Sequence, residues 1–234
     1  MEKRLKDFVW LYAKTKQAKN KYNNIYKNSA MIKEVCNDLK TALLEGVPLN
    51  LVDTFAGLAQ VVTYKNPDEN GNIVTKKMPV SYDTEGIGCV PNTSREKDLV
   101  PNSRKKGIIY FEDNGGMQII RNLSGGCKQY RGNVVLVCWM NRKKSVGETY
   151  TEVGKAAFDE IMEKLSGVLL SQWFINLKAS AVRFRQDPQV FNKYTYDETV
   201  LQFLRPPFEY FAIDLSVTFI TSCKVPITLN PQEC

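Results

Sequence analysis

The chain has 234 residues, of which 43% are hydrophobic and 24% charged, and its formal net charge is +7. This length is enough for one large or two small domains with a substantial core. The sequence contains no histidine, which removes the usual general base, the Ser-His-Asp and Cys-His arrangements and the commonest transition-metal ligand. The positive charge favours an anionic partner, although it is also a common route to solubility.

Six cysteines are scattered along the sequence without a Cys-x-x-Cys pair, and no histidine could complete a ligand set, so no zinc site is expected. A disulfide framework is not expected in a chain of this size without a secretory signal. Cys36 and Cys138 lie in apolar runs and are predicted to be buried, and the thiols are predicted to be reduced. No apolar run approaches the roughly 20 residues that span a bilayer. The charged N-terminus does not resemble a signal peptide. We therefore expect a soluble chain, intracellular at synthesis, that contacts no membrane and needs no cofactor.

Residues 2–46 are predicted to be helical, in two parts. The first part includes a basic stretch over 14–27 that also carries two tyrosines, which is typical either of an arm on nucleic acid or of a solvated helix face. The second part begins after Ser29, a good N-cap, and ends at Gly46.

Residues 49–82 are predicted to form a long β-hairpin with an exposed tip, because an Asn-Gly pair at 70–71 separates two apolar runs. Residues 83–106 lack periodicity and are predicted to be an irregular interaction loop. Hairpin and loop are both candidates for contacts between subunits.

A short strand over 108–111, a hairpin turn over 112–116 and a returning strand over 117–120 come next. The turn carries Glu112 and Asp113, which could bind a metal together with Asp83 or Glu85. Carboxylates are common at turns, however, so an ordinary solvated turn is favoured over a metal site.

The central unit runs from Arg131 to Arg185 as strand, helix and strand. It consists of an apolar run over 134–140, an amphipathic helix over 149–170 and a strand over 173–184. We expect an α+β fold with a single mixed or antiparallel β-sheet packed by helices. The whole chain, 1–234, is predicted to be one domain, divided into N-terminal helices (1–46), the hairpin and loop region (47–128), the core (129–223) and a tail (224–234).

A short helix is predicted to end at Leu204, before Pro206-Pro207, and the last strand follows. This strand alternates strictly, and one face is predicted to point into the core. That face carries Phe211, Ile213, Leu215, Val217 and Phe219.

The order of elements resembles that of the tail-terminator and neck-ring proteins of tailed bacteriophages. The residues that carry the resemblance are 134–140, 149–170, 173–184 and the segment from Pro206 to Leu215. The resemblance implies a structural virion protein, not an enzyme, that is made in the host cytoplasm and forms a ring of 6 or 12 subunits at the head–tail junction. Its implied partners are other phage neck, portal or tail proteins and non-specifically bound DNA in the channel.

Two basic clusters are the candidate contact residues for the channel lumen or for acidic neighbours: Arg104, Lys105 and Lys106, or Arg142, Lys143 and Lys144. No catalytic, cofactor-binding or metal-binding residue is assigned. Two alternatives remain open: a nucleic-acid-binding accessory protein, and a histidine-free metal-dependent nuclease.

Overall fold

The computed structural model describes residues 31–44, 52–67, 71, 73–82, 96–123, 127–146, 153–167, 174–184 and 187–220. Its strands are β1 (Thr54–Leu58), β2 (Gln60–Pro67), β3 (Ile73–Tyr82), β4 (Glu96–Asp98), β5 (Gly107–Asn122), β6 (Lys128–Asn141), β7 (Phe174–Phe184) and β8 (Phe208–Ile220). Its helices are a helix over 31–44, α2 (Arg142–Val146), α3 (Val153–Gly167) and α4 (Glu198–Leu201), with 3-10 turns η2 (Pro188–Phe191) and η3 (Gln202–Leu204).

The expected α+β fold is confirmed and the main sheet is mixed, but the strands form two sheets instead of the single sheet that was predicted. Five strands lie in the order β1-β5-β6-β8-β7, with β1 parallel to β5 and every other neighbouring pair antiparallel. The predicted strand-helix-strand unit is β6-α3-β7, and β8 is inserted between its two strands. The predicted hairpin, β2-β3, pairs with β4 in a second sheet of three strands.

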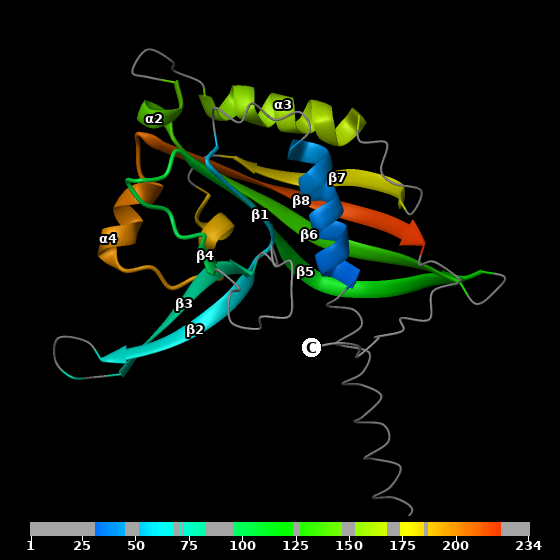
Figure 1. Cartoon of the computed structure of the whole chain (residues 1–234), viewed down its shortest axis with the longest axis horizontal. Coiled ribbons are helices and arrows are strands. Elements are labelled where there is room, and N and C mark those ends of the chain that lie inside the picture. The colour runs from blue at the N-terminus through cyan, green and yellow to red at the C-terminus, as the bar shows by residue number, and fades with distance from the viewer. Residues whose placement is uncertain are drawn as a thin grey trace, which may run out of the picture.

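One face of the main sheet is covered by the helix over 31–44 and by α3 (Figure 1). The predicted core face of β8 is confirmed here, since every one of its members is buried: Phe211, Ile213, Leu215, Val217 and Phe219. They pack against Leu39 and Leu43 of the first helix and Ile161 of α3. Both helices therefore bury one apolar stripe, as their periodicity predicts.

The opposite face is buried as well, beneath the segment 187–204. Trp139 is fully buried there; its indole N–H donates to the Phe203 carbonyl at 2.7 Å, and its ring stacks on Phe208. Burial on both faces explains why residues 134–140 of β6 form a continuous apolar run rather than an alternating one.

The predicted turn over 112–116 is wrong, because β5 continues as one strand from Gly107 to Asn122. Gly115 and Gly116 have φ values of 119° and 76°, and their N–H groups donate to Asp113 Oδ1 at 3.2 and 2.9 Å. Glycines in the left-handed region can bend a strand at a bulge as readily as they can reverse it. The chain reverses later, between Leu123 and Cys127.

Other boundaries are also corrected. Part of the predicted loop, Glu96–Asp98, is strand β4, which forms because β3 offers its edge and not because these charged residues favour strands. The short helix before Pro206 is confirmed as α4 and η3. The basic stretch over 14–27, the first part of the loop (83–95) and the tail lie outside the described residues.

The cysteine prediction holds for two thiols and fails for a third. Cys36 and Cys138 are free and buried, and burial raises the pKa of both thiols. Cys127 is disulfide-bonded. The scattered spacing of the cysteines gave no indication of this bond. Within the described ranges, no helix is long and apolar enough to cross a membrane.

Candidate functional site

The two basic clusters predicted as alternatives lie together at one end of the main sheet. Arg104, Lys105 and Lys106 immediately precede β5, while Arg142, Lys143 and Lys144 immediately follow β6 in helix α2. The antiparallel register pairs Gly107 with Met140, so both clusters leave the sheet at the same place. We call this surface the basic end.

Hydrogen bonds join the two clusters directly. The Asn141 N–H donates to the Lys106 carbonyl at 2.6 Å, and Lys144 Nζ donates to the Arg104 carbonyl at 3.0 Å. The Ser145 hydroxyl also donates to the Lys106 carbonyl, at 3.3 Å. The backbone carbonyls of the 104–106 cluster therefore hold α2, which carries the 142–144 cluster, in position.

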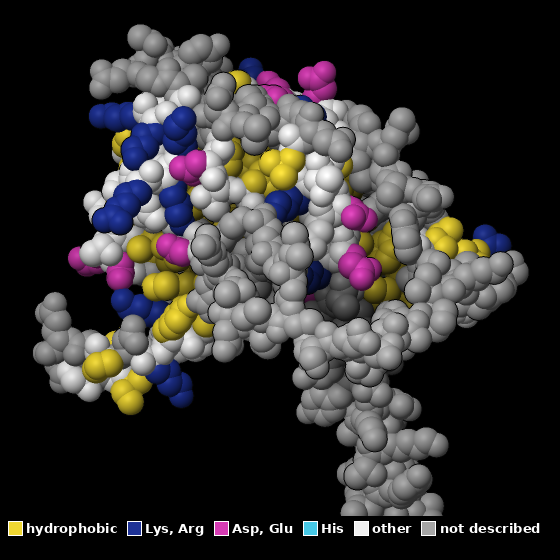
Figure 2. All heavy atoms as spheres, in the orientation of Figure 1, with side chains coloured by type: hydrophobic (Ala, Val, Ile, Leu, Met, Phe, Trp, Pro, Cys, Tyr) yellow, Lys and Arg dark blue, Asp and Glu magenta, His cyan; other side chains and the backbone are white. Residues whose placement is uncertain are grey.

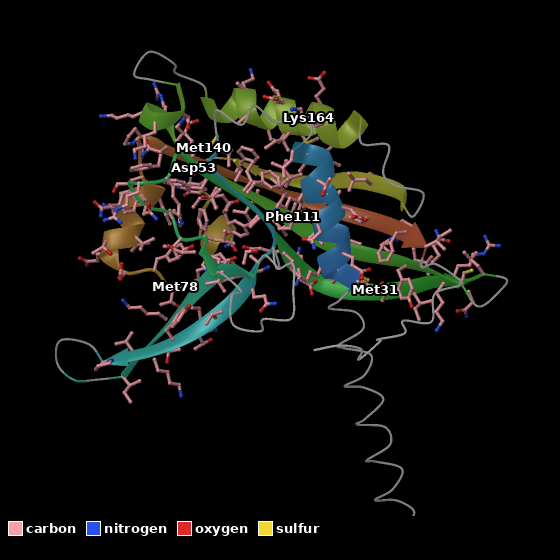
Figure 3. The ribbon with its side chains drawn as sticks, viewed as in Figure 1. Met31, Asp53, Met78, Phe111, Met140 and Lys164 are labelled. Atoms are coloured by element: carbon pink, nitrogen blue, oxygen red, sulfur yellow. The ribbon has the colours of Figure 1, made fainter. Side chains whose placement is uncertain are left out.

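Two polar side chains shape the turn that leads into β5. Asn102 Oδ1 accepts the N–H groups of Arg104 and Lys105 at 2.9 and 3.2 Å, as asparagine commonly does in turns. Asp53 Oδ2 accepts the Lys106 N–H at 2.8 Å, and Asp53 lies close to Met140 at this end of the sheet (Figure 3). Asn102 is one of the turn-forming residues that the sequence indicates, whereas sequence reasoning missed Asp53, because its role depends on the pairing of β1 with β5.

Lys105 differs from the other members of its cluster. Its ammonium group donates to the carbonyls of Asp98 and Val100 and lies 3.5 Å from Asp98 Oδ2. Its side chain is only 17% exposed, and desolvation lowers the pKa of its amine. Lys105 therefore stabilises the turn instead of presenting its charge to a partner.

The exposed charges of the basic end come from four of the six predicted residues: Arg104, Lys106, Lys143 and Lys144. Arg142 is half-buried at the start of α2. Arg205, which the sequence reasoning did not include, is exposed just before β8, whose first residue pairs with Asn141. Figure 2 shows lysine and arginine side chains gathered over α2 and along the neighbouring edge of the molecule. Such a surface can bind phosphates or carboxylates.

A second polar cluster lies under the segment 187–204. Glu112 is almost fully buried, accepts a hydrogen bond from the Tyr194 hydroxyl and forms an ion pair with Lys193 at 2.9 Å. Tyr110 and Tyr196 lie beside it, and burial raises the pKa of all three tyrosines. These tyrosines therefore stay neutral. The cluster links the segment 187–204, called the covering segment below, to β5.

The two carboxylates of the metal hypothesis that the structure describes, Glu112 and Asp113, are each engaged within the protein. Glu112 is engaged by Lys193 and Tyr194, and Asp113 accepts the N–H groups of the bulge. Asp83 and Glu85 lie outside the described residues. Among the residues that the structure describes, no group of three or more Cys, Asp or Glu side chains could hold a metal ion.

The β2-β3 ribbon projects away from the main sheet, on the same side of the molecule as the basic end (Figure 1). Midway along the ribbon, Lys76 forms an ion pair with Asp197 at 2.9 Å, and the Thr195 N–H donates to the Lys77 carbonyl at 2.9 Å. Val61 is exposed near the base of the ribbon, and Ile73 and Val74 are exposed near its tip. The ribbon is therefore attached at its middle and keeps exposed apolar side chains at both ends.

No protein-family model matches this chain, and neither does any curated protein.

Proposed function

We propose that the chain is a structural subunit of an oligomeric ring at the head–tail junction of a tailed bacteriophage, of the tail-terminator or neck kind. In this proposal the basic end faces the DNA channel, and the ribbon contacts a neighbouring ring protein. A ring of 6 or 12 subunits within the virion is the corresponding assembly. Closed rotational symmetry satisfies head-to-tail contacts of this type.

The observation that carries the proposal is the convergence of both basic clusters on one end of the sheet. Four exposed cations on a rigid support offer sequence-independent phosphate contacts, which suit DNA that has to pass through a channel. The α+β fold also agrees with the architecture that the resemblance implies.

A charge-reversal experiment tests the role of the basic end. The site variant combines Arg104→Glu, Lys106→Glu and Lys143→Glu. The matched control combines Arg121→Glu, Arg131→Glu and Lys178→Glu, which change three exposed cations away from the basic end by the same charge. DNA affinity is measured against salt concentration, and assembly by light scattering.

The site variant is expected to keep its assembly state and to lose DNA affinity, with the salt slope reduced by about three because three phosphate contacts are removed. The control should behave like the unmodified chain. Equal DNA binding by both variants would contradict the claim that the basic end contacts DNA.

A nucleic-acid-binding accessory protein is the second candidate, and the same basic surface favours it. The two candidates differ in the oligomeric state of the protein that binds DNA. An accessory protein would bind DNA strongly, and in a salt-dependent manner, as an isolated monomer. The nuclease alternative gains no support within the described residues, where the carboxylates do not cluster.

A further inference from the structure

Two hydrogen bonds accepted by β3 show which backbone groups of the ribbon point outward. The carbonyls of Lys77 and Pro79 accept from Thr195 and Leu99, at 2.9 and 3.2 Å, so both point away from β2. The β2-β3 register runs unbroken from Gln60↔Val80 to Pro67↔Ile73. Because hydrogen-bonded and non-hydrogen-bonded pairs alternate in an antiparallel ladder, the β2 partners of these residues also point outward.

Three residues of β2 therefore direct both their N–H and C=O groups away from β3: Val61, Thr63 and Lys65. This outer edge continues the edge with which β1 bonds β5, since the Ala59 N–H donates to the Phe111 carbonyl at 2.7 Å. Beyond Ala59 the ribbon leaves the main sheet (Figure 1). Among the described residues, nothing pairs with the outer edge of β2.

The two faces of the ribbon beside this edge differ in character. Lys65 and Lys77 are exposed on the face that also carries Thr63. Val62 and Tyr64 are half-buried on the opposite face, next to Met78. A strand added to this edge would therefore meet Lys65 beside Thr63 and the exposed Val61 on one side, and Val62 and Tyr64 on the other.

The charges of the ribbon indicate which kind of strand fits. The described residues of β2 and β3 include three lysines and no aspartate or glutamate. Lys76 is neutralised by Asp197, whereas Lys65 and Lys77 lie on the other face. Two copies of this edge would bring like charges onto one face, which is unfavourable, whereas acidic side chains would complement them.

We propose that the outer edge of β2 accepts an extended segment of another protein by strand addition, and that this segment alternates acidic and apolar residues. Its backbone pairs with Val61, Thr63 and Lys65, its acidic side chains lie on the Lys65 and Lys77 face, and its apolar side chains lie on the Val62 and Tyr64 face. The proposal goes beyond ring assembly, since strand addition at this edge needs only the ribbon.

The probe is a capped heptapeptide of alternating valine and glutamate, added to the full chain. Amide hydrogen exchange of the segment Gln60–Pro67 is followed by mass spectrometry. At saturating peptide we expect exchange of the three outward amides to slow by about tenfold, because each gains a carbonyl acceptor. A valine–lysine peptide of the same length should give no protection.

Matched variants separate backbone pairing from side-chain attraction. Thr63→Pro removes the central outward N–H without breaking a β2-β3 hydrogen bond and should abolish protection, whereas Thr63→Val should retain it. Lys65→Glu should transfer the preference to the valine–lysine peptide, and Lys155→Glu on α3 should change nothing.

The proposal is overturned if the valine–glutamate peptide gives no protection, or if both peptides protect equally. It is also overturned if Thr63→Pro alters the self-association of the chain, because the edge would then pair with a second copy.

Discussion

The main sheet and the β2-β3 ribbon are both built from β-strands, yet they are stabilised in different ways. Phe111, Trp139 and Phe211 of the sheet are at most 2% exposed, whereas Val61 and Ile73 of the ribbon are 47% and 72% exposed. Burial therefore stabilises the sheet, while ladder hydrogen bonds and two attachments at its middle hold the ribbon. Side chains that do not contribute to a core remain available for partners.

The largest expected effect is in the core of the sheet. Phe211→Ala removes a ring that lies under the helical face and packs edge-on against Phe158. We expect the free energy of unfolding to fall by about 3–5 kcal/mol, because the substitution leaves a cavity. Urea unfolding followed by circular dichroism measures this loss. A loss close to zero would show that the core is not packed as described.

A smaller effect is expected beneath the covering segment. Glu112→Ala leaves the Tyr194 hydroxyl without its acceptor and Lys193 without its counter-ion. Because Lys193 is 38% exposed and can be hydrated, we expect a loss of about 2 kcal/mol, below the full cost of breaking a buried pair. Unfolding in urea measures the loss, and a conservative Glu112→Gln variant should recover part of it.

Attachment of the ribbon should depend on acid pH. Hydrogen bonds from Thr199 and Lys76 lower the pKa of the Asp197 carboxyl from 3.8 to about 2. A lowered pKa in the folded state means that the stabilisation is complete above about pH 4 and is lost as the pH falls towards 2. Since the Asp197 side chain is 38% exposed, solvent screening limits the effect to about 1 kcal/mol or less.

The variant Asp197→Asn tests this assignment, because asparagine still caps α4 but cannot form the ion pair. Its unfolding free energy should vary less between about pH 4 and 2 than that of the unmodified chain. Identical pH profiles would assign the acid sensitivity to other carboxyls.

The smallest effect is expected on the ribbon itself. Ile73→Ala removes a side chain that is 72% exposed, so the free energy of unfolding should change by no more than about 0.5 kcal/mol. Comparison with Phe211→Ala in the same urea experiment sharpens the contrast between the two regions. A large loss for Ile73→Ala would mean that the ribbon tip is buried against something else.

Much of the main sheet was predictable from local patterns. The strict alternation of β8 and the continuous apolar run of β6 each indicated a strand, and both are found. Gly115-Gly116 misled the prediction, because two glycines are compatible with either a turn or a bulge, and only the continued pairing with β6 decides between them.

That single error also concealed the candidate site. If β5 had turned back at 112–116, its first residues would not have paired with the end of β6. Residues 104–106 would then not be expected to lie beside residues 142–144. The full-length β5-β6 pairing brings Lys106 beside Asn141 and joins the two basic clusters. The inward position of Lys105 could not be predicted from the sequence either. Its partners, the carbonyls of Asp98 and Val100, belong to a segment predicted to be irregular.

The most direct test of the central claim is the mass of the purified full chain by light scattering across concentration, with electron micrographs of the same sample. Ring assembly predicts a single closed species of 6 or 12 subunits that is visible as rings. A compact monomer of 26.7 kDa at every concentration up to the solubility limit, with strong salt-dependent DNA binding, would contradict ring assembly and favour the accessory protein.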